Sequence, residues 1–222
     1  MSHGLFGKLP AKRDFVAFDL PPAVLRPWET WLQGAVAGSR HGLGADWTAA
    51  FLKAPIWRFW CGANVLGRPA LGALMPSVDG VGRYFPLTVL AVAGDGQRFA
   101  PPARDSRTEH FAVLEDLMLG ALDPALDVDA FRQAVKALPP AEAIEGAATR
   151  PAEIFVGTGE DLDDALKQAQ DQAEAAALED LSLWWTIGGD GYAPAAFATR
   201  GLPSPVAFAG MLTGLGAREA SP

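Results

Sequence analysis

The residue types that most often perform catalysis are scattered along this sequence. None of the three histidines, His3, His41 and His110, has cysteine or carboxylate neighbours at a spacing typical of zinc or iron ligands. Ser77, His110 and Asp79 supply the residue types of a Ser–His–Asp triad. However, Ser77 lacks the Gly-x-Ser-x-Gly turn that exposes a nucleophile, so the match rests on residue type alone. We therefore interpret His3 and His41 as surface residues, and we expect no metal site and no cofactor.

A glycine turn at 157–159, Gly-Thr-Gly, stands between an expected strand at 154–156 and an expected helix from about 160. Phosphate-binding loops occupy such positions. Here the first helical turn carries four carboxylates, which stabilise the helix dipole and repel a phosphate. A Walker lysine and a complete dinucleotide fingerprint are also missing. The turn is interpreted as a helix cap and not as a nucleotide site.

Two other segments combine small, charged and aromatic residues beside predicted strands. They are Gly7-Lys-Leu-Pro-Ala-Lys-Arg-Asp-Phe15 and Pro76-Ser-Val-Asp-Gly-Val-Gly-Arg-Tyr-Phe-Pro-Leu87. Asp79 and Arg83 are close enough across a glycine turn to form an ion pair, and we hypothesise that Asp14 reaches a basic group of the other segment. Because both segments flank strands of one expected sheet, we predict that they meet in space.

Such an ion-pair network either locks the two segments together or presents a recognition surface, and the residues alone do not separate these interpretations. The candidate partner-binding or loop-locking residues are Lys8, Arg13, Asp14, Phe15, Ser77, Asp79, Arg83 and Trp184.

Hydrophobic periodicity places the elements that must position these residues. Strands are predicted at 4–10, 56–61, 70–75, 85–93, 154–156, 181–187 and 195–199. Helices are predicted from Pro21-Pro22 to the glycines at 38–44, at 47–53 after an Asp46 N-cap, around 111–118, at 128–138, from about 160 and from about 204.

The strand at 85–93 is apolar on both faces, as in the centre of a covered sheet. We expect a mixed α/β (α+β) fold with a single central, mostly antiparallel sheet flanked by helices. Residues 1–222 are expected to form a single domain, with a possible subdivision near 103–151. Trp28, Leu32 and Phe85 should be buried.

Composition excludes several classes of function. The chain has 222 residues, a net charge of −8 and one cysteine, Cys61. The net charge is +4 over residues 1–100 and −12 over residues 101–222, without a dense basic cluster, so nucleic acid and anionic membranes are unexpected partners. A single cysteine suits a reducing compartment, and neither a secretory signal nor a membrane-spanning segment is apparent. The expected location is the cytoplasm.

The sequence resembles the TagF family of type VI secretion-associated proteins. The resemblance is densest in Gly7-Lys-Leu-Pro10, Asp14-Phe-Val16, Trp57-Arg-Phe59, Pro76-Ser-Val-Asp79 and Gly82-Arg-Tyr-Phe-Pro-Leu87, and it continues weakly through Ser182-Leu-Trp-Trp185 and Gly201-Leu-Pro203 to Phe208. It implies a cytoplasmic, non-enzymatic regulator, generally a repressor, of type VI secretion.

The resemblance further implies binding to the forkhead-associated scaffold protein of the apparatus and action alongside a threonine kinase–phosphatase pathway. Some relatives carry a fused phosphatase domain, for which a chain ending at Pro222 leaves no room. Two alternatives stay open at this point: a structural subunit of the secretion apparatus, and a small hydrolase that uses the Ser77–Asp79 loop.

Overall fold

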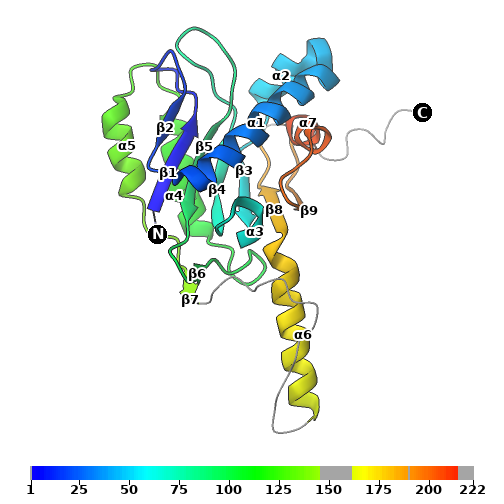
Figure 1. Ribbon diagram of the computed structural model, residues 1–222. Helices are drawn as coiled ribbons and strands as arrows, with labels where there is room; N and C mark the ends of the chain where they lie inside the picture. The colour runs from blue at the N-terminus through cyan, green and yellow to red at the C-terminus, as the bar shows by residue number, and fades with distance from the viewer. Residues whose placement is uncertain (1, 146–161, 190, 215–222) are drawn as a thin grey trace, which may run out of the picture.

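A seven-stranded sheet organises the computed structural model, which describes residues 2–145, 162–189 and 191–214. Its order is β2-β1-β5-β4-β3-β8-β9, and every neighbouring pair is antiparallel (Figure 1). The predicted mixed α/β fold with one central, mostly antiparallel sheet is confirmed. The strands are β1 (Ser2–Gly7), β2 (Val16–Phe18), β3 (Trp57–Cys61), β4 (Ala70–Met75), β5 (Leu87–Val92), β8 (Leu181–Thr186) and β9 (Ala195–Arg200).

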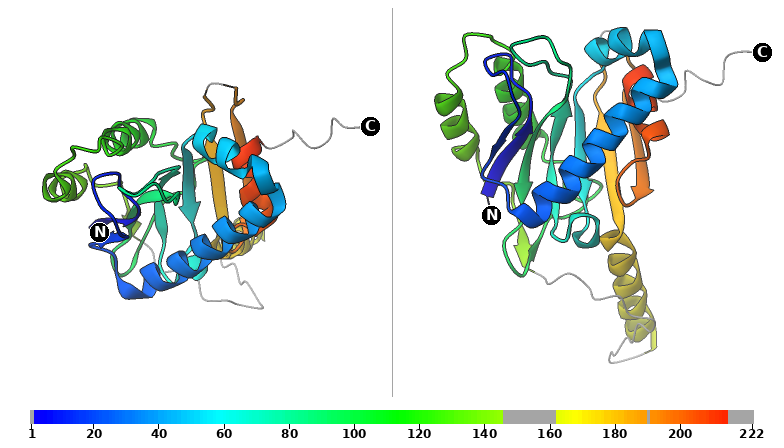
Figure 2. Two further views of the ribbon diagram at one scale, coloured as in Figure 1. Left: turned by 90° about the horizontal axis from the view of Figure 1, so that it is seen from above. Right: turned by 45° about the horizontal axis from the view of Figure 1, so that its top comes forward.

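Helices cover both faces of the sheet (Figure 2). One face carries α1 (Pro22–Leu43), α2 (Trp47–Lys53) and α7 (Pro205–Thr213), and the other carries α4 (Thr108–Gly120) and α5 (Val128–Lys136). Helix α6 (Leu162–Glu179) extends past the end of the sheet (Figure 1). Smaller elements are the turns η1 (Gly44–Asp46) and α3 (Ala63–Leu66) and the pair β6 (Gln97–Arg98) and β7 (Ile144–Glu145).

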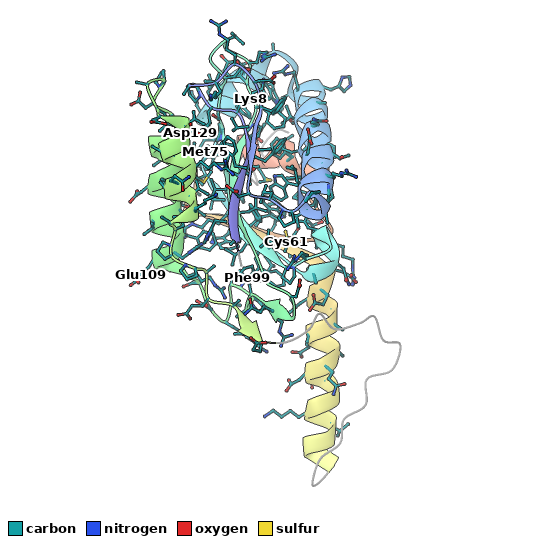
Figure 3. All side chains as sticks on the ribbon, turned by 60° about the vertical axis from the view of Figure 1, so that its left-hand side comes forward. Lys8, Cys61, Met75, Phe99, Glu109 and Asp129 are labelled. Carbon is teal, nitrogen blue, oxygen red and sulfur yellow. The ribbon has the colours of Figure 1, made fainter. Side chains whose placement is uncertain are left out.

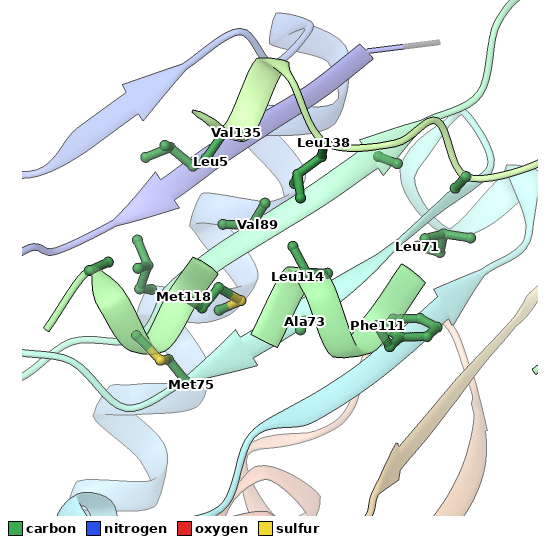
Figure 4. Packing of buried hydrophobic residues seen from close by; sticks show 14 of the residues in the cluster. Leu5, Leu71, Ala73, Met75, Val89, Phe111, Leu114, Met118, Val135 and Leu138 are labelled. Atoms are coloured by element: carbon green, nitrogen blue, oxygen red, sulfur yellow. The ribbon is translucent and has the colours of Figure 1, made fainter. Parts of the chain in front are cut away.

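The central strands are apolar on both sides because each side meets a helical layer. In β4, Leu71, Ala73 and Met75 point toward α4 and α5, where they pack with Phe111 and Met118 (Figure 4). The alternating residues of β4 and β5 join the second core beneath α1. This two-sided burial explains the continuous apolar run that the sequence shows at 85–93.

An aromatic cluster forms the core beneath α1. Trp28 is fully buried, its ring lies 4.7 Å from that of Phe59, and its indole N–H donates to the Thr88 hydroxyl at 3.2 Å. Leu32 and Phe85 are buried in the same cluster. The predicted burial of Trp28, Leu32 and Phe85 is therefore confirmed.

Several local predictions need correction. Asp46 does not cap α2, because its backbone is helical and its side chain makes no capping hydrogen bond. One helical turn, α3, lies between β3 and β4, where no helix was predicted. The helix predicted from about 160 does not pack along the sheet, because α6 runs beyond it and leaves Leu166 59 % exposed. The strand expected at 154–156 and the glycine turn at 157–159 lie outside the described residues.

Candidate functional site

The two predicted segments meet at one end of the central sheet. Antiparallel pairing sets Gly7, the last residue of β1, opposite Leu87, the first residue of β5. Gly7 permits this approach, because its φ is +142° and a Cβ would lie 2.1 Å from the Pro86 carbonyl oxygen. The chain therefore leaves β1 beside the point where it enters β5. We call the joined segments, 8–15 and 77–85, the junction, and Figure 3 shows Lys8 at this end of the molecule.

Main-chain carbonyls of the first segment accept hydrogen bonds from the second. The Ser77 hydroxyl donates to the Lys8 carbonyl at 2.7 Å, and the Gly80 N–H donates to the Lys12 carbonyl at 2.7 Å. The Arg83 guanidinium donates to the Arg13 carbonyl. The predicted meeting of the two segments is confirmed, whereas their role in binding a partner stays a prediction.

Asp79 is the electrostatic centre of the junction. Its side chain is fully buried and accepts from the Val81 and Arg83 N–H groups at 3.1 and 2.9 Å. It also accepts from Arg83 Nε at 2.7 Å and from Lys8 Nζ at 2.9 Å. Burial alone raises the pKa of a carboxyl, but these donors outweigh it and hold the pKa of Asp79 well below its usual range. Asp79 therefore stays ionised and ties Lys8 to Arg83.

Phe15 gives the junction an apolar surface that is supported from below. Its ring stacks on Phe6 at 5.8 Å and meets Phe85 edge-on at 4.8 Å, and Lys8 Nζ lies 5.0 Å from its centroid. Phe15 nevertheless remains 42 % exposed. Such a ring is held by packing but still faces solvent.

Asp14 does not pair as hypothesised, and Trp184 lies in the core. Asp14 is exposed, and its carboxylate accepts from the neighbouring Phe15 N–H instead of a basic group of the other segment. Trp184 is fully buried beneath α1, where it packs with Trp28 and Phe59. Both predictions rested on residue type, and for Trp184 residue type does not show which face of β8 turns inward. Trp184 therefore lies in the core, and its role in partner binding or loop locking stays a prediction.

The hypothetical triad is not assembled. Ser77 is buried and its hydroxyl donates to a carbonyl, so no base activates it. His110 instead stacks on His3 with 5.6 Å between ring centroids. His41 is exposed on α1, as expected, but the prediction that His3 is a surface residue was wrong, because β1 lies inside the sheet. Desolvation and the neighbouring His110 lower the pKa of His3 to about 4.

Sequence reasoning also missed contributions to the junction. Lys12 joins the segments through its carbonyl, and the ion pair between Lys8 and Asp79 was not foreseen. The position of Lys8, one residue beyond the end of β1, was the available signal. Among the described residues, no group of three or more His, Cys, Asp and Glu side chains is arranged to hold a metal ion. In the same part of the chain, no helix is long and apolar enough to cross a bilayer.

Two comparisons identify relatives of this chain. Residues 4–138 match the family model described as TagF N-terminal domain, type VI secretion system-associated. The crystal structure of PA0076 from Pseudomonas aeruginosa PAO1 is 33 % identical, with a TM-score of 0.80 over 100 % of this chain and 97 % of that one. A search of curated proteins gave no significant match. The family model spans both segments of the junction and more than half of the sequence, so the chain belongs to the TagF family of type VI secretion system-associated proteins.

Proposed function

We propose that this protein is a non-enzymatic, post-translational repressor of type VI secretion. It acts in the cytoplasm as a single domain over residues 1–222, and it binds the forkhead-associated scaffold protein of the apparatus. It works alongside a threonine kinase–phosphatase pathway. Family membership supports the association with type VI secretion.

The observation that carries the proposal is the way the junction uses its charged groups. Asp79 is engaged by four donors and the Ser77 hydroxyl by a carbonyl, so both are committed to holding backbone in place. A hydrolytic site needs the opposite, a nucleophile and a base free to exchange protons. A rigid, exposed surface around Phe15 suits recognition of another protein. This arrangement favours a binding protein over a hydrolase that uses Ser77 or Asp79.

The proposal is tested by tagging the protein at its native locus and identifying what co-purifies from the cytoplasm. We expect the forkhead-associated scaffold protein in stoichiometric amounts, and we expect deletion of the gene to increase export of type VI substrates into the medium. Stable sedimentation with the assembled apparatus, without free scaffold complex, supports the alternative of a structural subunit. In that case deletion abolishes export, which would contradict repression.

A further inference from the structure

The junction carries a charge opposite to that of the whole chain. Its two segments contain four cations, Lys8, Lys12, Arg13 and Arg83, but only two carboxylates, Asp14 and Asp79. The junction therefore has a net charge of +2 in a protein whose net charge is −8. An excess of one sign within a single rigid surface attracts a partner of the other sign and accelerates its association.

The net charge of +2 arises because Asp79 alone pairs with both Lys8 and Arg83, and because the exposed Asp14 balances only one of Lys12 and Arg13. Asp79 neutralises buried Lys8 and pairs with Arg83, whereas Lys12 and Arg13 are exposed and, within the described residues, neither side chain forms an ion pair. Their main chains are nevertheless fixed, because both carbonyls accept hydrogen bonds from the second segment. Hydrogen bonds to their carbonyls thus fix the positions of Lys12 and Arg13, while both side chains stay exposed.

Exposed apolar groups accompany these cations. Phe15 is 42 % exposed over the Phe6 and Phe85 rings, and Val81 is 57 % exposed beside Gly80, whose N–H bonds to Lys12. A Cβ on Gly80 would lie 2.9 Å from the Pro10 carbonyl oxygen, so the segments touch closely here. An aromatic ring that is already immobilised loses little conformational entropy when a partner covers it.

We propose that the junction docks an acidic segment of the forkhead-associated scaffold protein. Its carboxylates pair with Lys12, Arg13 and the exposed part of Arg83, and one of its apolar side chains packs on Phe15. This inference rests on the proposed function and adds the surface and the chemistry of the partner. The charge of the junction makes the interaction sensitive to salt, since solvent-exposed ion pairs are screened beyond a Debye length of about 8 Å at physiological ionic strength.

The test measures binding of the full-length protein to the purified full-length scaffold by isothermal titration calorimetry. The double variant Lys12→Glu/Arg13→Glu keeps both carbonyls and is expected to fold. We expect it to bind at least tenfold more weakly than the wild type at about 0.15 M salt. The difference should shrink to less than about threefold at 1 M salt, where the Debye length is about 3 Å.

The matched control is Arg26→Glu/Lys167→Glu, which changes the net charge equally at exposed positions of α1 and α6. It should bind within about twofold of the wild type if local charge decides affinity. Phe15→Ala should also weaken binding in a protein whose denaturation shows it to be folded.

Equal weakening by the Lys12/Arg13 variant and by the control would overturn the inference, as would no weakening by the former. Preferential binding of the wild type to phosphatidylserine vesicles, lost in the Lys12/Arg13 variant, would also overturn it. Failure of the wild type to bind the scaffold at all contradicts the proposed function itself, and the docking surface with it.

Discussion

Replacing Asp79 with asparagine removes the charge that holds the junction together, and with it the acceptor oxygen Oδ2 that Lys8 Nζ and Arg83 Nε share. Asparagine has nearly the same size, and its carbonyl oxygen still accepts from a backbone N–H of the turn. Lys8, however, keeps an ammonium whose side chain is only 7 % exposed, and it loses its ionic partner. Breaking a buried ion pair by removing one partner costs about 3–5 kcal/mol. We expect Asp79→Asn to lower the free energy of unfolding by about that amount.

A double-mutant cycle separates the ion pair from other effects. Lys8→Met should cost less than Asp79→Asn, about 1–2 kcal/mol, because Asp79 keeps Arg83 and two backbone donors. The double variant has neither the Lys8 ammonium nor the Asp79 carboxylate, so neither charge stays buried without the other. Its destabilisation should therefore fall short of the sum of the single effects by about 2 kcal/mol. Asp14→Asn is the matched control, an exposed acid of the same junction that should change stability by less than about 0.5 kcal/mol.

Urea denaturation followed by tryptophan fluorescence measures these differences, with equal m values as the condition for comparing them. The sign of the pH dependence gives a second check. Because folding lowers the pKa of Asp79, its contribution is complete above the ordinary aspartate pKa of about 4 and declines as the pH falls below it. Asp79→Asn should lose less stability than the wild type on acidification. A cost below about 1 kcal/mol, or strict additivity in the cycle, would refute the role assigned to Asp79.

Three further predictions follow from buried groups. Trp28→Ala should lower the free energy of unfolding by about 3–5 kcal/mol in urea, and a loss below about 1 kcal/mol would show that its cluster does not stabilise the fold. The pKa of His3 is about 4 in the folded protein, below its ordinary value of about 6.5, so His3 destabilises the fold as the pH falls between these values. His3→Phe should therefore reduce the loss of stability between pH 7 and 4.5 by on the order of 2 kcal/mol. An unchanged pH profile of the free energy of unfolding would contradict this. Ser77→Ala should cost about 1–2 kcal/mol but leave control of secretion intact, and loss of control in a folded, scaffold-binding variant would revive the hydrolase alternative.

Much of the sheet could be predicted because its strands carry strong local patterns. The strand at 70–75 and the helix at 47–53 have the bounds expected from apolar periodicity and the flanking Gly and Pro residues. The double-sided run at 85–93 predicted a covered central strand, and β5 lies between β1 and β4. Local patterns of this kind are set by neighbouring residues, so they are visible without the tertiary structure.

The junction was predictable in outline but not in its pairing. The position of both segments beside strands of one sheet predicted that they meet. That Lys8 pairs with Asp79, and that Asp14 does not reach a basic group of the other segment, depends on strand register. Register also decides that His3 is buried against His110, 107 positions away in the sequence. The burial of Trp184 likewise depends on which face of β8 turns toward α1. These features arise from tertiary packing, which residue type and spacing do not specify.

Type VI export tests most directly whether the protein represses secretion through the junction. Export is measured in a strain that lacks the protein and is complemented with each variant at equal abundance. We expect the wild type and Arg26→Glu/Lys167→Glu to restore low export, and Lys12→Glu/Arg13→Glu to leave export as high as in the deletion strain. If the Lys12/Arg13 variant represses export as fully as the wild type, repression does not act through the junction. If the deletion strain does not export more than its parent, the protein is not a repressor.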